Sequence, residues 1–274
     1  MSVMDHGSYQ DHAGYERIRS WLGDRCGISY PDHKADLLRQ RLSRVTRSFS
    51  LTDLDELAGA ITNGKRHDGE LAVMHAASTN HTFFFREPEV LETFAKNILP
   101  QLNQREQIRI WSAAASTGDE AYTIAMLVAE HLGTSALSKL MILGSDISAP
   151  VLERAELGVF SRRQIAQMDP TIRGKYMSPT GIEQYRVNEN LRNTCTFRRL
   201  NLKATPYPFA KQFQVVFCRN ILYYFEHEDQ IATLNALYDA TEPGGWLITS
   251  VTEAVRDLCP GWIPVTTGIY RRNG

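Results

Sequence analysis

Apolar side chains recur at helical spacing through the first quarter of the chain. Ile18, Trp21 and Leu22 occupy positions i, i+3 and i+4, and this pattern ends at Gly27. The same reasoning, applied along the segment, predicts a first helix from Tyr15 to that glycine and further helices over 31–48, over 54–63 and from about 68. The segment carries little strand signal, so a small helical domain is expected.

Beyond Pro100 the pattern changes to short apolar runs that alternate with helical segments. Strands are predicted over 109–113, 140–146, 213–218 and 245–251, and helices over 119–132, 149–157 and 228–241. Strands that alternate with helices indicate a parallel, doubly wound sheet. Inside this region, residues 184–188 and 194–200 have the look of short antiparallel strands around turns. They predict a small β insertion over about 176–202.

Composition and charge narrow the class of protein. The 274 residues are 43% hydrophobic and 22% charged, which is typical of a soluble globular protein. The net charge of −1 gives no reason to expect nucleic-acid binding. The four cysteines form no CxxC pair, so neither a zinc site nor a disulfide framework is indicated. No apolar run approaches the roughly twenty residues of a membrane span, and we expect a cytoplasmic monomer that is not inserted in a membrane.

The loop after the first predicted strand carries the first chemical signal. Residues 112–120 read Ser-Ala-Ala-Ala-Ser-Thr-Gly-Asp-Glu, with one glycine where a dinucleotide site requires G-x-G-x-x-G. Asp119 and Glu120 suit a ligand with an ammonium or sulfonium group, and S-adenosylmethionine has both and no phosphate. The alternative is a helix start with acids that favour the helix dipole.

Two further polar groups follow predicted strands, where doubly wound sheets bind their ligands. Asp146 ends the second strand and is suited to accept hydrogen bonds from ribose hydroxyls, although Asp is also a common turn residue. Asn220 follows a buried strand and offers an amide to adenine or to an ammonium group. Tyr223 or Tyr224 would face a sulfonium, although tyrosines after a strand more often pack in the core.

A third signal lies between the two regions. Three phenylalanines, Phe83 to Phe85, precede Arg86 and would place a fixed cation under an apolar lid. The alternative is a core-packing aromatic run beside a surface arginine.

The four segments together, in this order, resemble the CheR family of chemoreceptor glutamate methyltransferases, and three of them carry its most specific motifs. They read T-N-H-T-F-F-F-R over 79–86, A-A-S-T-G-D-E over 114–120 and F-C-R-N-I-L-Y-Y-F over 217–225. The resemblance extends from about Tyr15 to Arg272. His81 and Ala121 depart from the Glu and Pro that are frequent in the family, and neither position is assigned to the cofactor.

The resemblance implies a site and a fold. The cofactor, S-adenosylmethionine, is expected to be surrounded by Asn80, Thr82, Arg86, Ala114, Glu120, Asp146, Asn201, Leu202, Arg219 and Asn220. Arg86 and Tyr224 match positions next to the transferred methyl group and are the expected catalytic residues. The implied fold is a Rossmann-like α/β methyltransferase domain with a small antiparallel β subdomain, preceded by an N-terminal helical domain. No metal is expected.

The implied reaction converts receptor glutamates to methyl esters and S-adenosylmethionine to S-adenosylhomocysteine, in chemosensory adaptation. The implied partner is the methylation region of a chemoreceptor's cytoplasmic helical bundle. A basic stripe would dock this acidic bundle through Arg39, Arg41, Arg44 and Arg47, although such charge runs are usually solvated helix faces. A short turn over 177–183 favours an enzyme that does not require a receptor C-terminal pentapeptide. Two alternatives are a catalytically weak cofactor-binding scaffold or sensor and a methyltransferase with another acceptor.

Pattern and resemblance together divide the chain into four parts. They are a disordered tail over 1–12, a helical receptor-recognition domain over 13–76, a linker over 77–104 that contributes to the cofactor site, and a methyltransferase domain over 105–274.

Overall fold

The computed structural model describes residues 6–64, 66–78, 81–255 and 257–274. The chain forms two compact units. The first contains residues 1–79 and 224–229, and the second contains 80–223 and 230–274.

The first unit is helical. Its elements are α1 (His6–Cys26), a 3₁₀ turn η1 (Asp32–Lys34), α2 (Ala35–Ser48), α3 (Leu54–Thr62) and α4 (His67–Ala77). Ile18, Leu38 and Leu57 are at most 1% exposed and belong to its apolar core. Gly14 lets α1 and α3 approach closely, because a Cβ at this position would lie 2.3 Å from the backbone nitrogen of Asp55.

Helix α1 corrects one expectation. It begins at His6, so residues 6–12 are helical and the prediction of a disordered tail over 1–12 is wrong for them. The Leu54 N–H donates to Asp11 Oδ1 at 3.2 Å, which ties this first part of α1 to α3. The polar composition of the segment gave no sign of such a tertiary contact.

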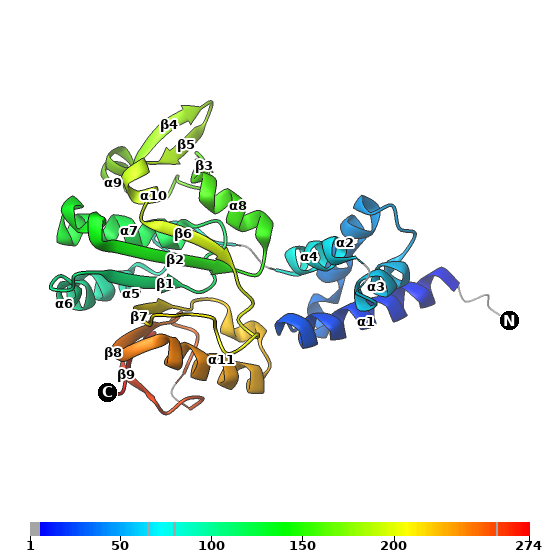
Figure 1. The fold of residues 1–274 in the computed structure, drawn as a ribbon. Helices are drawn as coiled ribbons and strands as arrows, with labels where there is room; N and C mark the ends of the chain where they lie inside the picture. The colour runs from blue at the N-terminus through cyan, green and yellow to red at the C-terminus, as the bar shows by residue number, and fades with distance from the viewer. Residues whose placement is uncertain (1–5, 65, 79–80, 256) are drawn as a thin grey trace. The chain divides into compact units, whose positions relative to one another are not determined.

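The second unit contains a seven-stranded sheet in the order β6-β2-β1-β7-β8-β10-β9. Its strands are β1 (Ile108–Ser112), β2 (Leu140–Asp146), β6 (Cys195–Arg199), β7 (Phe213–Phe217), β8 (Thr241–Ile248), β9 (Trp262–Thr266) and β10 (Ile269–Arg272). Figure 1 shows β6, β2, β1, β7 and β8 side by side in this order. The connecting helices are α7 (Asp119–Leu132), the 3₁₀ segment η3 (Thr134–Lys139), α8 (Ala149–Leu157) and α11 (His227–Ala240).

The strand order reverses between β1 and β7, which pair in parallel. The chain steps from β1 to β2 in one direction and from β7 to β8 in the other, and both pairs are parallel. Because such crossovers are right-handed, α7 and α11 cover opposite faces of the sheet. The predicted Rossmann-like α/β fold is confirmed, with β9 and β10 added as an antiparallel edge that the sequence pattern did not reveal.

Two segments differ from the sequence-based expectation. Residues 88–102 form α5 (Pro88–Thr93), a π-helical turn (Phe94–Ile98) and α6 (Leu99–Leu102), rather than a linker. Their side chains at Val90, Phe94 and Ile98 are at most 3% exposed and lie in the main core. The apolar positions of this segment therefore had a packing role that was missed.

The predicted β insertion over 176–202 is also partly wrong. Residues 195–199 form β6, an edge strand that pairs in parallel with β2 in the main sheet. Only Phe197 is buried in this strand, so the segment lacks the continuous apolar run that is typical of a parallel strand. The small sheet instead has the order β3-β5-β4 and recruits β3 (Val159–Ser161).

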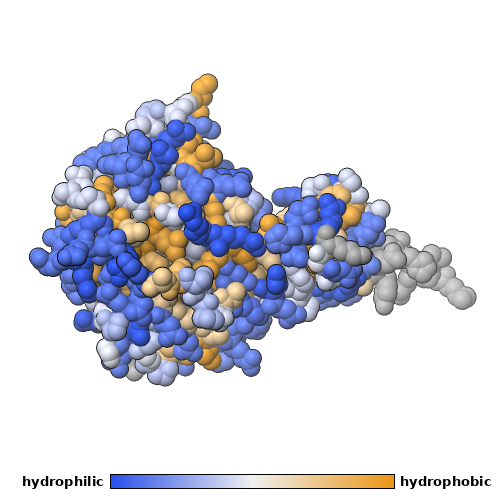
Figure 2. All heavy atoms as spheres, viewed as in Figure 1, coloured by the Kyte–Doolittle hydropathy of each residue, from blue (hydrophilic) through white to orange (hydrophobic). Residues whose placement is uncertain are grey.

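The remaining two strands of the small sheet are β4 (Met177–Gly181) and β5 (Gln184–Val187), flanked by α9 (Pro170–Tyr176) and α10 (Glu189–Arg192). All pairings in it are antiparallel. Ile182, in the β4–β5 turn, is 96% exposed, and Figure 2 shows an apolar projection at the end of this hairpin. Within the described residues, no helix combines the length and the hydropathy that a membrane-spanning segment requires.

Candidate active site

The loops after β1 and β2 meet at the carboxyl edge of the sheet. Asp146, the last residue of β2, accepts the Ser116 N–H at 3.0 Å and the Ser148 N–H at 2.9 Å. Ser116 has a left-handed backbone with φ +48°, and its hydrogen bond to Asp146 holds this turn. Burial raises the pKa of the Asp146 carboxyl, and the backbone hydrogen bonds offset part of this rise.

Glu120 lies in the first turn of α7, next to the point where the strand order reverses. Its Oε1 accepts Ser112 Oγ–H at 2.8 Å, and its Oε2 accepts Arg219 Nη1–H at 2.9 Å. Ser112 ends β1 and Arg219 follows β7. The carboxylate therefore bridges the two neighbouring strands at the place where doubly wound sheets bind ligands.

The guanidinium of Arg219 is almost wholly enclosed, with 3% of the side chain exposed. Besides Glu120, it donates from Nη2 to the backbone carbonyl of Arg86 at 2.6 Å. The same nitrogen lies 3.3 Å from Glu87 Oε2. One buried cation thus faces two carboxylates, which leaves the cluster of Arg219, Glu120 and Glu87 with a net negative charge.

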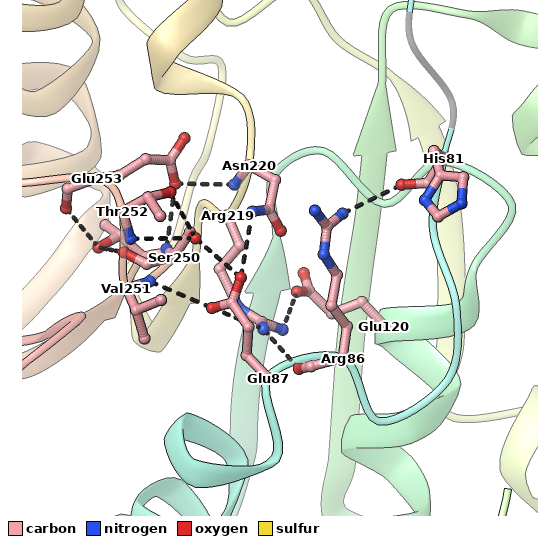
Figure 3. Close-up of polar contacts among 11 residues, drawn as sticks. His81, Arg86, Glu87, Glu120, Arg219, Asn220, Ser250, Val251, Thr252 and Glu253 are labelled. Carbon is pink, nitrogen blue, oxygen red and sulfur yellow. Dashed lines mark hydrogen bonds and ion pairs between the residues drawn. The ribbon is translucent and has the colours of Figure 1, made fainter. Parts of the chain in front are cut away.

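Two carboxylates that sequence reasoning missed complete the network (Figure 3). Glu87 accepts hydrogen bonds from Ser250 Oγ at 2.8 Å, Asn220 Nδ2 at 3.2 Å and Val251 N at 3.2 Å. Glu253 accepts four backbone N–H groups, from Asn220, Ile221, Leu222 and Ser250, at 2.8 to 3.1 Å. Together they fix the loop after β7 to the loop after β8.

Their pKa values shift in opposite directions. Burial raises the pKa of Glu253 above its usual range despite its four backbone donors. Burial acts the same way on Glu87, but the Ser250 hydroxyl, the Arg219 charge and the Asn220 amide outweigh it and lower the pKa of Glu87. Glu87 is therefore an ionised partner of Arg219 at neutral pH.

Comparisons with known proteins identify the family of this chain. Residues 80–266 match the family model described as "CheR methyltransferase, SAM binding domain", and residues 13–75 match "CheR methyltransferase, all-alpha domain". The chain belongs to the CheR methyltransferase family. This confirms the resemblance found in the sequence, and SAM in the first description denotes S-adenosylmethionine.

Chemotaxis protein methyltransferases of several bacteria are similar to this chain over most of their length. The chain is 35% identical over 245 residues to the chemotaxis protein methyltransferase of Escherichia coli, covering 88% of this chain and 84% of that protein. It is 34% identical to chemotaxis protein methyltransferase 2 of Pseudomonas aeruginosa, covering 87% and 85%. It is 32% identical to the chemotaxis protein methyltransferase of Vibrio parahaemolyticus, covering 89% and 90%.

In this CheR methyltransferase, Arg86 lies at the start of the network but directs its side chain elsewhere. Arg86 Nη1 donates to the backbone carbonyl of His81 at 3.1 Å, and its guanidinium carbon lies 5.7 Å from the centre of the Phe83 ring. Phe84 packs edge-on against Phe160 at 4.8 Å in the core. Phe84 is thus a core residue, as the packing interpretation expects, and Phe83 lies beside the arginine.

The other expected cofactor residues occupy loops of the same unit. Thr82 and Ala114 are half-buried in the segments that precede α5 and α7. Asn201 and Leu202 follow β6, where Asn201 Oδ1 accepts the Lys203 N–H at 3.1 Å. Asn80 lies outside the described residues.

Tyr224 belongs to the helical unit. Its backbone carbonyl accepts the Ser29 N–H at 2.9 Å. The following residue, Phe225, packs against Gly27, where an added Cβ would lie 2.7 Å from the ring.

The four arginines of the expected docking stripe have different surroundings. Arg41 Nη1 donates to the Tyr30 hydroxyl at 3.0 Å and to the carbonyls of residues 76–78 at 3.3 to 3.4 Å, so it caps the end of α4. Arg39 stacks 3.9 Å from the centre of the Tyr15 ring. Arg44 and Arg47 are exposed. The guanidinium of Arg41 is therefore occupied within the helical unit.

The polar groups at this end of the sheet fit S-adenosylmethionine. Ser116 Oγ and Asp119 Oδ1 are buried and have no hydrogen-bond partner among the described residues, so this loop has polar capacity left for a ligand. Burial raises the pKa of Asp119. The carboxyl groups of Asp119 and Glu120 at this helix start suit a cationic ligand and oppose a pyrophosphate. No cluster suited to a metal ion occurs within the described part of the chain.

Proposed function

We propose that this chain transfers the methyl group of S-adenosylmethionine to glutamate side chains of bacterial chemoreceptors. The products are glutamate methyl esters and S-adenosylhomocysteine, formed in chemosensory adaptation. Membership of the CheR methyltransferase family supports the reaction class. The observation that carries the site assignment is the Arg219–Glu120 pair at the reversal of strand order, flanked by Asp146.

Three acids and an amide would hold the cofactor. Asp146 keeps lone pairs beyond those that accept backbone N–H groups, and it would accept the ribose hydroxyls. Glu120 and Asp119 would face the ammonium end, and Asn220 would contact the adenine or the ammonium. Thr82, Ala114, Asn201 and Leu202 would contribute contacts from the surrounding loops.

The chemistry requires little acid–base assistance. When bound, the sulfonium supplies an electrophilic methyl group and a neutral thioether leaving group. A glutamate carboxylate is already more than roughly 99% ionised at neutral pH, given a usual pKa near 4.3. Its oxygen forms the new bond to the methyl carbon as the carbon–sulfur bond breaks, and sulfur keeps the electron pair. No general base is needed, so the residues act by placement and by exclusion of water.

Arg86 is the proposed orienting cation. Its only described polar contact is one backbone carbonyl, so the guanidinium keeps donors for a carboxylate. Tyr224 is proposed to position the methyl group.

The proposed partner is the cytoplasmic methylation bundle of a receptor, which places the activity in the cytoplasm and requires no more than a monomer. Glutamate-rich helices suit a basic docking surface, and the exposed pair Arg44 and Arg47 on α2 is best placed to provide it. Two residues, Ile182 and Glu183, separate β4 from β5. Such a short turn supports independence from a receptor pentapeptide, and measurable binding of a receptor tail peptide to the protein would contradict that part.

The reaction is tested by transfer of labelled methyl groups from S-adenosylmethionine to chemoreceptor-containing membranes, followed by mild alkali. Release of the label as methanol establishes a carboxyl methyl ester. Label that resists alkali would assign another acceptor atom to the same methyltransferase. Absence of label, with S-adenosylhomocysteine still bound in calorimetry, would favour a scaffold that binds the cofactor without transfer.

A further inference from the structure

Glu87 is the point at which three loops of the catalytic unit meet. It ends the segment that carries Thr82 and Arg86, and it bonds to the loop after β7 through Asn220 and to the loop after β8 through Ser250. Its backbone has φ +56°, a left-handed conformation that is rare for a residue with a side chain. Such a conformation persists where the surroundings hold it in place.

We propose that Glu87 is a positioning residue for the cofactor site, acting through Arg219 and Asn220. This inference rests on the proposed role of that site. Glu87 does not need to touch the cofactor, because its carboxylate already has four partners in the chain. Its effect is to fix the direction of the Asn220 amide and to share with Glu120 the charge of Arg219.

The geometry explains why one carboxylate is needed. Oε1 accepts from Asn220 Nδ2 and Ser250 Oγ, while Oε2 accepts from Val251 N and faces Arg219 Nη2 at 3.3 Å. All of these groups are donors, so both oxygens must be acceptors. An amide in this place would point one NH₂ group at a donor. Glu87→Gln therefore keeps the size of the side chain and replaces one of its two acceptor oxygens with a donor.

Asn220 is the link to the cofactor. Its φ is +58°, and its N–H is held by Glu253 while its side chain is held by Glu87. Backbone and amide are thus set by two different carboxylates. Loss of Glu87 would release the amide while Glu253 keeps the backbone in place, so the defect should be local.

The test is binding of S-adenosylhomocysteine, measured by calorimetry, which does not depend on the identity of the methyl acceptor. Glu87→Gln is expected to weaken binding about tenfold, the usual effect of losing hydrogen bonds to a charged group. Glu89→Gln is the matched control, because Glu89 lies two residues away on α5, is exposed, and loses the same charge. The control should bind like the wild type.

A double-mutant cycle separates positioning from a general loss of structure. Asn220→Gly suits the left-handed backbone and removes the amide. If Glu87 acts through Asn220, Glu87→Gln should cost much less affinity in the Asn220→Gly background than in the wild type. Equal costs in both backgrounds, or unchanged binding by Glu87→Gln, would overturn the proposal.

Two further outcomes remain interpretable. If Glu87→Gln does not fold, Ser250→Ala removes one donor to Glu87 and should weaken binding in the same direction by a smaller factor. Unchanged binding by that variant would count against the proposal. Failure of the wild-type protein to bind S-adenosylhomocysteine would instead contradict the proposed site itself.

Discussion

Arg219 Nη1 donates to Glu120 Oε2 at 2.9 Å, joining residues that are 99 positions apart in the chain. They meet because β1 and β7 are parallel neighbours at the reversal of strand order. The exposed fractions of the two side chains are 3% and 14%, so little water screens the pair. In such surroundings, removal of one partner costs more than removal of both, because a charge is left buried alone.

Arg219→Met should therefore destabilise the catalytic unit strongly. Both Glu120 and Glu87 would lose their cation, and we expect the free energy of unfolding to fall by about 3 kcal/mol or more. Urea unfolding measures this loss. Arg162→Met is the control, since Arg162 and its partner Glu183 are both 68% exposed. That variant should change stability by no more than about 0.5 kcal/mol, and equal losses in the two variants would contradict the structural role given to Arg219.

Arg86→Ala should lower the rate of methyl transfer strongly and change the stability of the fold little. The described contacts of its side chain are one carbonyl and one ring face, so the free energy of unfolding should change by less than about 1 kcal/mol. Methyl transfer should fall on the order of a hundredfold, because a carboxylate would lose its orienting cation. Arg86→Lys, which keeps the charge but lacks the planar fork, should recover part of the rate. A folded Arg86→Ala variant with normal turnover would exclude the proposed role.

Glu120 and Asp146 were singled out from the sequence because each stands at a recognisable strand end or helix start, whereas Arg219 was assigned through the family resemblance. The position at a strand end is local information, and parallel strands bring their carboxyl ends to one edge. Glu87 and Glu253 were not predicted, because their roles depend on partners that are distant in the sequence. Glu87 accepts a hydrogen bond from Ser250, 163 positions away, and no spacing in the sequence indicates that contact.

The fold shows the same division between local and distant information. The helices and the central strands follow from their apolar periods. Strand β6 was misassigned because an edge strand with one buried side chain, Phe197, has no local mark that distinguishes parallel from antiparallel pairing. Strand β9 was not predicted because its four last residues are exposed and include Pro264.

The pH dependence of cofactor binding should report on Asp146. Burial raises the pKa of its carboxyl above the usual 3.8, so it takes up a proton at a higher pH than an ordinary aspartate. Because the ionised form is the better acceptor for ribose hydroxyls, affinity for S-adenosylhomocysteine should fall as pH decreases, beginning above the usual range. Calorimetry between neutral and acidic pH measures this. Asp146→Asn should bind weakly and lose much of this pH dependence, and an unchanged profile would assign the titration to another group.

Two arginines of α2, Arg44 and Arg47, should act in receptor docking, whereas Arg41 should act in folding. Arg44 and Arg47 are exposed, so replacing both with Glu should leave S-adenosylhomocysteine affinity unchanged. The same change should raise the KM for receptor on the order of tenfold, with a weaker dependence on salt than in the wild type, because attraction to an acidic helix is lost.

Arg41 should behave differently because its guanidinium binds the carbonyls at the end of α4 and the Tyr30 hydroxyl. Arg41→Ala leaves these acceptors without their donor and should destabilise the helical unit by about 1–3 kcal/mol. Thermal unfolding measures the loss, and assays below the lowered Tm measure the KM for receptor. Arg41→Ala could instead keep wild-type stability and raise that KM as much as the replacement of Arg44 and Arg47 with Glu. In that case the Arg41 guanidinium contacts the receptor, and its contacts with α4 contribute little to folding.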